Sequence, residues 1–152
     1  MVKEAYAEYA KKYKLPDYDA LDQEFEISLI EKKEFLLRQI RRKMTERVEQ
    51  SIGLLHDILQ PDVGSITSMH ECTSCTQEEK EQLAELFREI MLVHRALLEA
   101  EYAQDLEQDA KIINETLEQW PALRKKTLNF VKKMKTAWKE TTEVKEILEY
   151  LG

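Results

Sequence analysis

The sequence QPDVGSITSMHECTSCT, residues 60–76, lies at the midpoint of a chain of 152 residues. It contains both cysteines of the chain, one of its three prolines and one of its three glycines. Proline and glycine interrupt helices, and the flank on each side runs for roughly 40 residues with almost none of either. We therefore expect a loop over 60–76 at the tip of a helical hairpin.

Apolar residues on both sides of this loop recur at helical spacing. Before the loop, intervals of mostly four residues predict one long helix over 18–59. After it, Thr76-x-x-Glu79 has the form of a capping box and begins a second long helix over 77–119. The first stripe is Leu21, Phe25, Leu29, Leu36, Ile40, Met44, Val48, Ile52, Leu55 and Leu59, and the second begins with Leu83, Leu86, Ile90, Val93, Leu97 and Ala100.

Three shorter helices complete the expected secondary structure. Leu15-Pro16 ends a helix over 1–14, because a residue before proline is disfavoured in the helical conformation. Trp120-Pro121 separates a basic helix over 121–139, whose apolar stripe is Leu123, Thr127, Val131, Met134 and Trp138. A last short helix is expected over 142–151. No segment shows the alternation of a strand. We expect one all-α domain, an elongated antiparallel hairpin with the short helices packed at one end.

Two helices alone cannot cover every apolar residue near the tip. Leu37, Leu54 and Ile58 lie off the first stripe, and Phe87, Met91 and Leu98 lie off the second. Exposed apolar patches of this kind mark association. We therefore expect a homodimer through the long helices, which would form a four-helix bundle.

Composition restricts the compartment and the chemistry. No apolar run approaches the roughly 18 residues of a membrane span, and the N-terminus lacks the apolar segment of a secretory signal. Two cysteines without such a signal favour the reducing cytoplasm. Gly53, Gly64 and Gly152 are too far apart for a P-loop or a dinucleotide-binding fingerprint.

The tip has the spacing of a metal or redox site. His70, Cys72 and Cys75 form a His-x-Cys-x-x-Cys pattern that could supply three ligands of a zinc ion, with His56 as a fourth. Alternatively, Cys75 precedes a helix start, where the helix dipole lowers a thiol pKa and favours redox use. A second Cys-x-x-Cys is missing. We therefore favour ordinary loop thiols and no cofactor, with a metal- or redox-responsive binding module as an alternative.

Paired glutamates offer a second alternative, a magnesium-dependent nucleotide phosphohydrolase. Residues at i and i+3 share one helix face, so Glu-x-x-Glu pairs could bind magnesium. The Glu-x-x-Asp that would complete such a site does not occur, and no histidine follows a glutamate by three residues as in di-iron bundles. The pairs include Glu31/Glu34, Glu46/Glu49, Glu78/Glu81, Glu115/Glu118 and Glu143/Glu146.

Positive charge is concentrated in one helix. The stretch from Pro121 to Lys139 contains seven basic residues and no acidic one, so the rest carries −14 against an overall net charge of −7. Such a patch could bind nucleic acid or another anionic partner. We favour neutralisation within the chain, by Asp17–Glu26 and the acidic residues of 99–118. The patch is Arg124, Lys125, Lys126, Lys132, Lys133, Lys135 and Lys139.

The sequence as a whole predicts a non-catalytic cytoplasmic interaction or scaffold protein. It does not identify the pathway or the partner, and it leaves open whether the two cysteines are free, bridged or metal-bound. A protein partner is expected in addition to the second copy.

Overall fold

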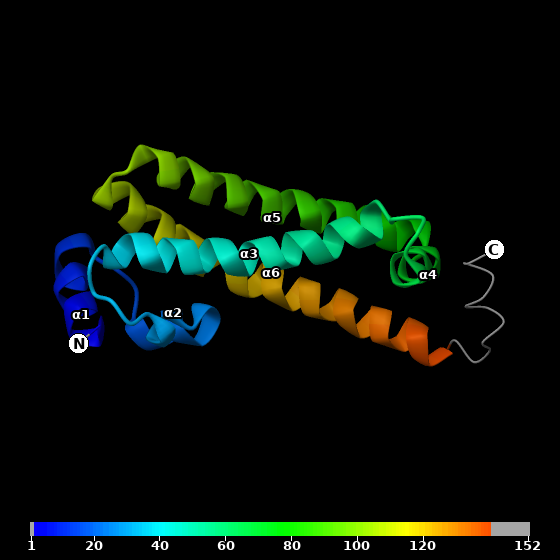
Figure 1. Cartoon of the computed structure of the whole chain (residues 1–152), viewed down its shortest axis with the longest axis horizontal. Coiled ribbons are helices and arrows are strands. Elements are labelled where there is room, and N and C mark those ends of the chain that lie inside the picture. Colours follow the sequence, from blue (N-terminus) through cyan, green and yellow to red (C-terminus); the bar gives the residue numbers. More distant parts are fainter. Residues whose placement is uncertain (1, 141–152) are drawn as a thin grey trace. The chain divides into compact units, whose positions relative to one another are not determined.

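A computed structural model of the chain describes residues 2–140 (Figure 1). All regular structure in this range is helical, which confirms the all-α class. The helix predicted over 142–151 lies outside the described residues. The helices are α1 (Val2–Tyr13), α2 (Tyr18–Phe25), the 3₁₀ helix η1 (Ile27–Leu29), α3 (Leu36–Leu59), α4 (Ile66–Ser74), α5 (Gln77–Ala103) and α6 (Leu106–Glu140).

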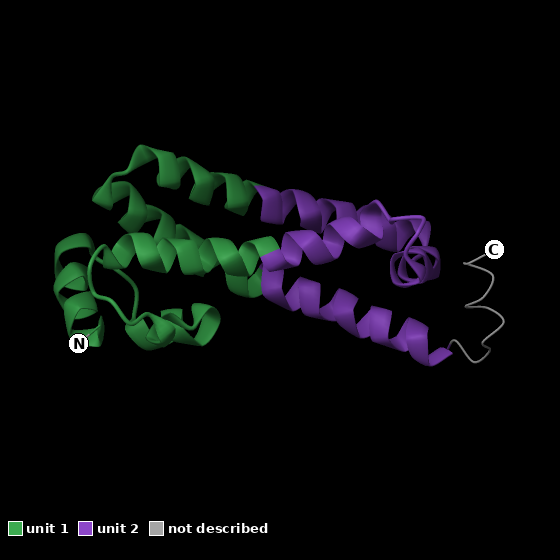
Figure 2. Cartoon of the chain, viewed as in Figure 1, with its two compact units in different colours: residues 1–49, 92–122 green, residues 50–91, 123–152 purple. Residues whose placement is uncertain are grey.

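The contacts within the chain divide it into two compact units (Figure 2). Unit 1 contains residues 1–49 and 92–122, and unit 2 contains residues 50–91 and 123–152. Helices α3, α5 and α6 each contribute one segment to each unit. The second half of α6 therefore belongs to the same unit as the tip, where the sequence predicted only two helices.

The long helix predicted over 18–59 is divided in the structure. Helix α2 starts at an N-cap, Asp17, whose carboxylate accepts a hydrogen bond from the Ala20 N–H at 3.2 Å. It ends at Glu26, which has a φ of 55°, and the Asp22 side chain accepts a hydrogen bond from the Ser28 N–H at 2.7 Å. Asp22 therefore stabilises the turn that stops α2 without glycine or proline.

Packing explains why the spacing of apolar residues did not predict the break after α2. Leu29, a member of the predicted stripe, is exposed, whereas Ile27 and Ile30 are buried in unit 1. The following residues 31–35 are exposed and precede α3. Burial of two isoleucines outside the stripe thus requires a change of direction that a continuous helix could not provide.

The second boundary also lies elsewhere than predicted. Helix α5 ends at Ala103, Gln104 has a φ of 52°, and α6 begins at Leu106. The spacing of the apolar residues is irregular at this point, because Ala100, Ala103 and Leu106 follow one another at two successive intervals of three. Pro121, expected to start a new helix, lies inside α6. Proline has a helix-compatible φ but no N–H, so it removes one backbone hydrogen bond. Burial of the neighbouring Trp120 and Leu123 offsets that loss.

The tip is more ordered than the predicted loop. Ser65 caps α4 by accepting a hydrogen bond from the Ser68 N–H at 3.2 Å. The capping box at the start of α5 is confirmed in both directions: the Thr76 N–H donates to Glu79 Oε1, and the Glu79 N–H donates to Thr76 Oγ1, each at 3.1 Å.

Each unit has its own apolar core, drawn largely from the predicted stripes. Leu37 and Ile58, expected to be uncovered in a single chain, are buried. Their burial follows from the contribution of α6 to both units, and it removes part of the argument for a dimer. Buried stripe residues in unit 1 include Ile40, Met44, Val48, Val93 and Leu97, and those in unit 2 include Leu55, Leu83, Leu86 and Ile90.

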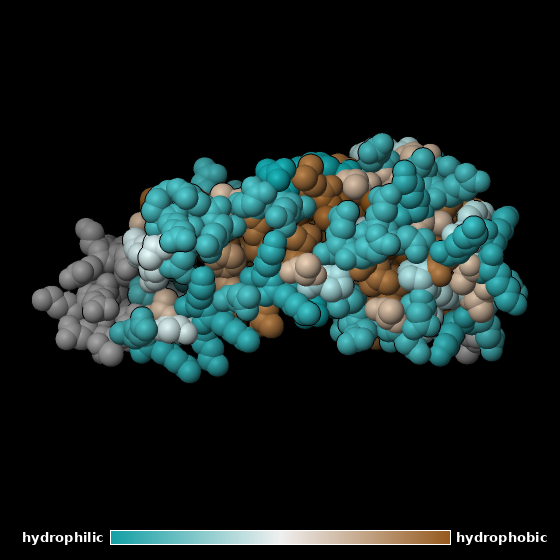
Figure 3. Space-filling model, turned by 180° about the vertical axis from the view of Figure 1, so that it is seen from behind, coloured by the Kyte–Doolittle hydropathy of each residue, from teal (hydrophilic) through white to brown (hydrophobic). Residues whose placement is uncertain are grey.

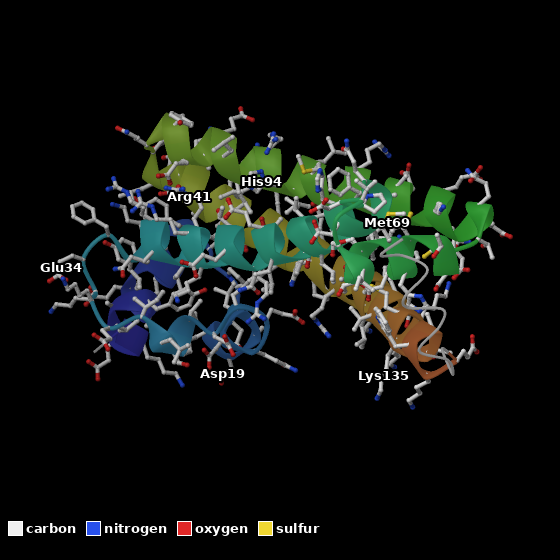
Figure 4. All side chains as sticks on the ribbon, turned by 45° about the vertical axis from the view of Figure 1, so that its right-hand side comes forward. Asp19, Glu34, Arg41, Met69, His94 and Lys135 are labelled. Carbon is white, nitrogen blue, oxygen red and sulfur yellow. The ribbon has the colours of Figure 1, made fainter. Side chains whose placement is uncertain are left out.

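Unit 1 also contains a buried ion-pair network around Arg41 of α3, labelled in Figure 4. Arg41 is 2% exposed, and its Nε donates to Oδ1 of buried Asp109 at 2.7 Å. It also donates to Glu101, which accepts a hydrogen bond from Arg42 Nη2 at 2.8 Å. The hydrogen bonds from Arg42 and Arg41 lower the pKa of Glu101 to about 2. These pairs connect α3, α5 and α6 within unit 1.

Candidate functional site

The second half of α6 has one face buried in unit 2. Leu123, Thr127, Phe130 and Met134 are buried along this face. Val131, predicted to belong to it, is 39% exposed, and Phe130 occupies the buried position instead. Val131 is therefore accessible to a partner, whereas Phe130 is not.

The opposite side of α6 carries a continuous stripe of exposed residues, which we call the α6 outer face. Its members Lys125, Leu128, Lys132, Lys135 and Lys139 follow one another at intervals of three and four residues, so they lie in one line along the helix. Val131 lies beside Leu128, and all six residues are exposed. Lys135 is labelled in Figure 4, and Figure 3 shows hydrophobic residues at the surface between hydrophilic ones on one side of the molecule.

Two other lysines of the helix are neutralised by acids of α5. Lys126 Nζ lies 3.4 Å from Glu89 Oε2, and Lys133 Nζ lies 3.3 Å from Glu79 Oε2. The hydrogen bond from the Thr76 backbone lowers the pKa of Glu79, and Lys133 lowers it further. Both acids belong to unit 2.

The predicted internal neutralisation therefore uses different partners from those expected. The helix does not turn back at Pro121, and its basic half lies in unit 2, while the acids proposed as partners lie in unit 1. Several of those acids have other partners: Glu26 pairs with Arg47 and Asp19 with Lys3.

The charge of the α6 outer face is not compensated by the part of the chain that the structure describes. Within residues 2–140, the side chains of Lys125, Lys132, Lys135 and Lys139 form no ion pair or hydrogen bond. The stretch 121–139 contains no acidic residue that could compensate them along the helix. Of the predicted basic patch, these four lysines are the ones available to an external group.

A cavity of about 510 Å³ lies in unit 2 beside the same helix. Its apolar lining includes Ile58, Phe130 and Met134, and its polar lining includes the Glu79–Lys133 ion pair. Cavities of a few hundred cubic ångströms are typical of small-molecule sites. The lining carries both acidic and basic side chains, so it does not favour a ligand of one charge.

The four residues of the predicted metal site are dispersed. His70 is buried, with its ring centroid 4.2 Å from that of Trp138 and its Nε2 3.5 Å from the Ala137 carbonyl oxygen. His70 and Cys75 both line the cavity, whereas Cys72 and His56 do not. His56 is exposed on α3. Within residues 2–140, no three histidine, cysteine, aspartate or glutamate side chains are grouped so that they could hold a metal ion.

Both cysteines are free thiols, and each is half-buried. Cys75 caps the C-terminus of α4, and its N–H donates to the Cys72 carbonyl oxygen at 3.2 Å. The sequence suggested a lowered pKa from the start of α5. Instead, burial raises the pKa of Cys75, and the nearby Glu79 raises it further. The redox alternative required the opposite shift.

Alkylation of Cys75 is expected to be slow at neutral pH. A raised pKa leaves less thiolate at pH 7, and thiolate is the reactive form. In a Cys72→Ser variant, the rate of alkylation of Cys75 by iodoacetamide should rise with pH. The pH at the midpoint of this rise should be higher for the folded protein than for the same protein unfolded in denaturant. Mass spectrometry across a pH series measures both profiles. A midpoint at or below that of the unfolded protein would contradict this expectation and restore the redox alternative.

Within residues 2–140, the glutamate pairs do not come together into a group of three or more side chains that could hold a metal ion. Glu31 and Glu34 lie outside any helix, so they lose the shared face on which the pairing rests. Glu46 and Glu49 are exposed on α3, where Glu49 Oε1 lies 3.1 Å from His94 Nε2. Glu143 and Glu146 lie outside the described residues.

Comparison with protein families, curated proteins and solved structures finds no match for the chain. None of the helices within residues 2–140 combines the length and the apolar composition needed to cross a bilayer. The second half of α6 thus carries both exposed lysines and the exposed apolar side chains Leu128 and Val131.

Proposed function

We propose that the chain is a non-catalytic interaction protein that binds a protein partner through the α6 outer face. The observation that carries the proposal is the position of Leu128 and Val131, 43% and 39% exposed, among four lysines without a partner in the described residues. Protein interfaces combine a central apolar patch with a polar rim. The α6 outer face has both parts on one helix.

The rigid setting of this face supports a binding role. Phe130 and Met134 anchor the helix in unit 2, and the Lys126–Glu89 and Lys133–Glu79 pairs hold one side of it against α5. A surface held in place before binding loses less conformational freedom when a partner docks. Two free thiols are consistent with a reducing compartment, and we propose the cytoplasm.

We further propose that the chain forms a homodimer through its long helices, as a four-helix bundle of two hairpins. Leu98 and Tyr102 support this proposal, because they are exposed and lie four residues apart on α5. Light scattering should give twice the mass of 18.0 kDa at micromolar concentration. A monomer under these conditions would contradict the dimer without affecting the α6 outer face.

Photo-crosslinking tests the interaction role. A benzophenone amino acid at position 128 should capture a discrete protein partner in extracts of the source cells, because Leu128 is an exposed apolar residue of the face between Lys125 and Lys132. The matched control carries the same group at Val63, which is 81% exposed outside this face. Identical products from both positions, or none from position 128, would overturn the proposal.

A further inference from the structure

The pattern of the α6 outer face restricts the chemistry of its partner. Lys125, Lys132 and Lys139 are separated by seven residues each, and Leu128 and Lys135 repeat the same interval. Seven residues are close to two helical turns, so the face is a straight strip. It extends for about 20 Å at 1.5 Å per residue. A strip of this shape matches one side of another helix.

The charges specify an acidic counterpart. Glu89 and Glu79 of α5 are engaged by Lys126 and Lys133, which lie two turns apart on one flank of the buried face. Within residues 2–140 the four lysines of the outer face pair with no acid, so we expect them to attract an external acidic group. Complementary potentials guide association and fix orientation, so carboxylates placed along the edge of a partner helix would pair with them.

The apolar pair distinguishes a protein segment from a polyanion. Leu128 and Val131 lie between Lys125 and Lys132 on the strip, where phosphates would leave them exposed to water. No aromatic side chain is available on this face to stack against a base, because Phe130 is buried and Trp138 packs against His70. The overall net charge of −7 also opposes the approach of nucleic acid and anionic bilayers, most strongly at low ionic strength, where screening is weak.

Building on the proposed function, we propose that the occupant of the α6 outer face is an acidic amphipathic helix. Its central apolar side chains would cover Leu128 and Val131, and its flanking aspartates or glutamates would pair with Lys125, Lys132, Lys135 and Lys139. Binding then combines burial of apolar surface with electrostatic attraction.

A synthetic peptide tests this directly. The probe is a fluorescent helical peptide as long as the stretch 124–139, with leucines at two central positions four residues apart and glutamates along both edges. Anisotropy titration against the full chain should show saturable binding that weakens at least tenfold between about 0.05 and about 0.5 M salt, where the Debye length falls below 10 Å. A peptide with serines in place of the two leucines should bind at least tenfold more weakly.

Variants of the chain locate the site. Lys132→Glu/Lys135→Glu should reduce affinity for the peptide at least tenfold, and Leu128→Ser/Val131→Ser should reduce it without reducing its salt dependence. All four positions are exposed, so circular dichroism should show unchanged helicity. Lys11→Glu/Lys12→Glu makes the same change of charge at exposed positions of α1 and should leave affinity unchanged.

The outcomes separate this inference from the proposed function. Equal effects of the α1 and α6 charge reversals, or binding of single-stranded oligonucleotides or anionic vesicles instead of the peptide, would overturn the acidic helix. Dissociation of a dimer by Lys132→Glu/Lys135→Glu would assign the face to a second copy and also overturn it. Absence of peptide binding together with a specific crosslink at position 128 would leave the interaction role intact and reject only its acidic partner.

Discussion

Replacing Arg41 with methionine is expected to reduce the free energy of unfolding by about 3–5 kcal/mol. Methionine retains much of the volume but removes the charge that Asp109 faces at 2.7 Å. Asp109 is 4% exposed, so its carboxylate would be left without a compensating charge in the core of unit 1. A loss of this size is a large part of the roughly 5–15 kcal/mol that stabilises a typical domain. Urea denaturation followed by circular dichroism measures it.

Two controls separate burial from charge. Arg42→Ala removes the neighbouring guanidinium, whose side chain is 57% exposed, and should cost less than about 1 kcal/mol. Arg41→Met/Asp109→Leu removes both charges, and its stability should return close to that of the parent, because apolar pairs often replace buried ion pairs without loss. Equal losses for Arg41→Met and Arg42→Ala would show that water solvates Asp109 in the folded protein.

Replacing Trp120 with alanine should cost about 3–5 kcal/mol of unfolding free energy. Trp120 is 1% exposed, and its ring centroid lies 6.3 Å from that of Phe25. The substitution leaves a cavity in unit 1 and removes an aromatic pair worth roughly 0.5–1.5 kcal/mol. Thermal and urea unfolding measure the loss.

Trp120→Phe is the matched variant and should cost less than about 1.5 kcal/mol. It keeps an aromatic ring against Phe25 and removes an indole N–H that, within residues 2–140, is buried without a hydrogen-bond partner. An unsatisfied buried donor costs about 1–3 kcal/mol of stability. Removing the indole N–H therefore offsets part of the stability that the smaller ring of phenylalanine loses. A loss as large as that of Trp120→Ala would show that the N–H is satisfied and contributes to stability.

The candidate surface was only partly predictable from the sequence. The absence of acidic residues over 121–139 identified a basic segment, which forms the second half of α6 instead of a separate helix. Its exposed apolar residues were missed, because Val131 was assigned to the core and Leu128 was given no role. The seven-residue spacing from Lys125 to Lys139 was the available signal. Only packing against α5 shows that Phe130 turns inward and that Lys126 and Lys133 are neutralised.

The tip shows a different limit of sequence reasoning. The pattern of His70, Cys72 and Cys75 brings three ligand-type residues close in sequence, but α4 forms there and directs His70 against Trp138. Trp138, whose ring packs against His70, lies 68 residues further along the chain, so no local pattern reveals this contact. Likewise, the helix dipole argument for Cys75 was outweighed by burial and by Glu79.

The sequence by itself determined the helical class, most of the buried stripe and the capping box at Thr76 and Glu79. These depend on local backbone hydrogen bonding and on the spacing of apolar residues, which neighbouring residues specify. Tertiary structure decided where the long helices stop and which charges are compensated. The turns at Glu26 and Gln104 contain no glycine or proline, and the continuity of α6 through Pro121 opposes a local preference. Burial of Ile27, Ile30 and Trp120 outweighs those preferences, because packing of distant segments contributes more free energy than the local bonds it replaces.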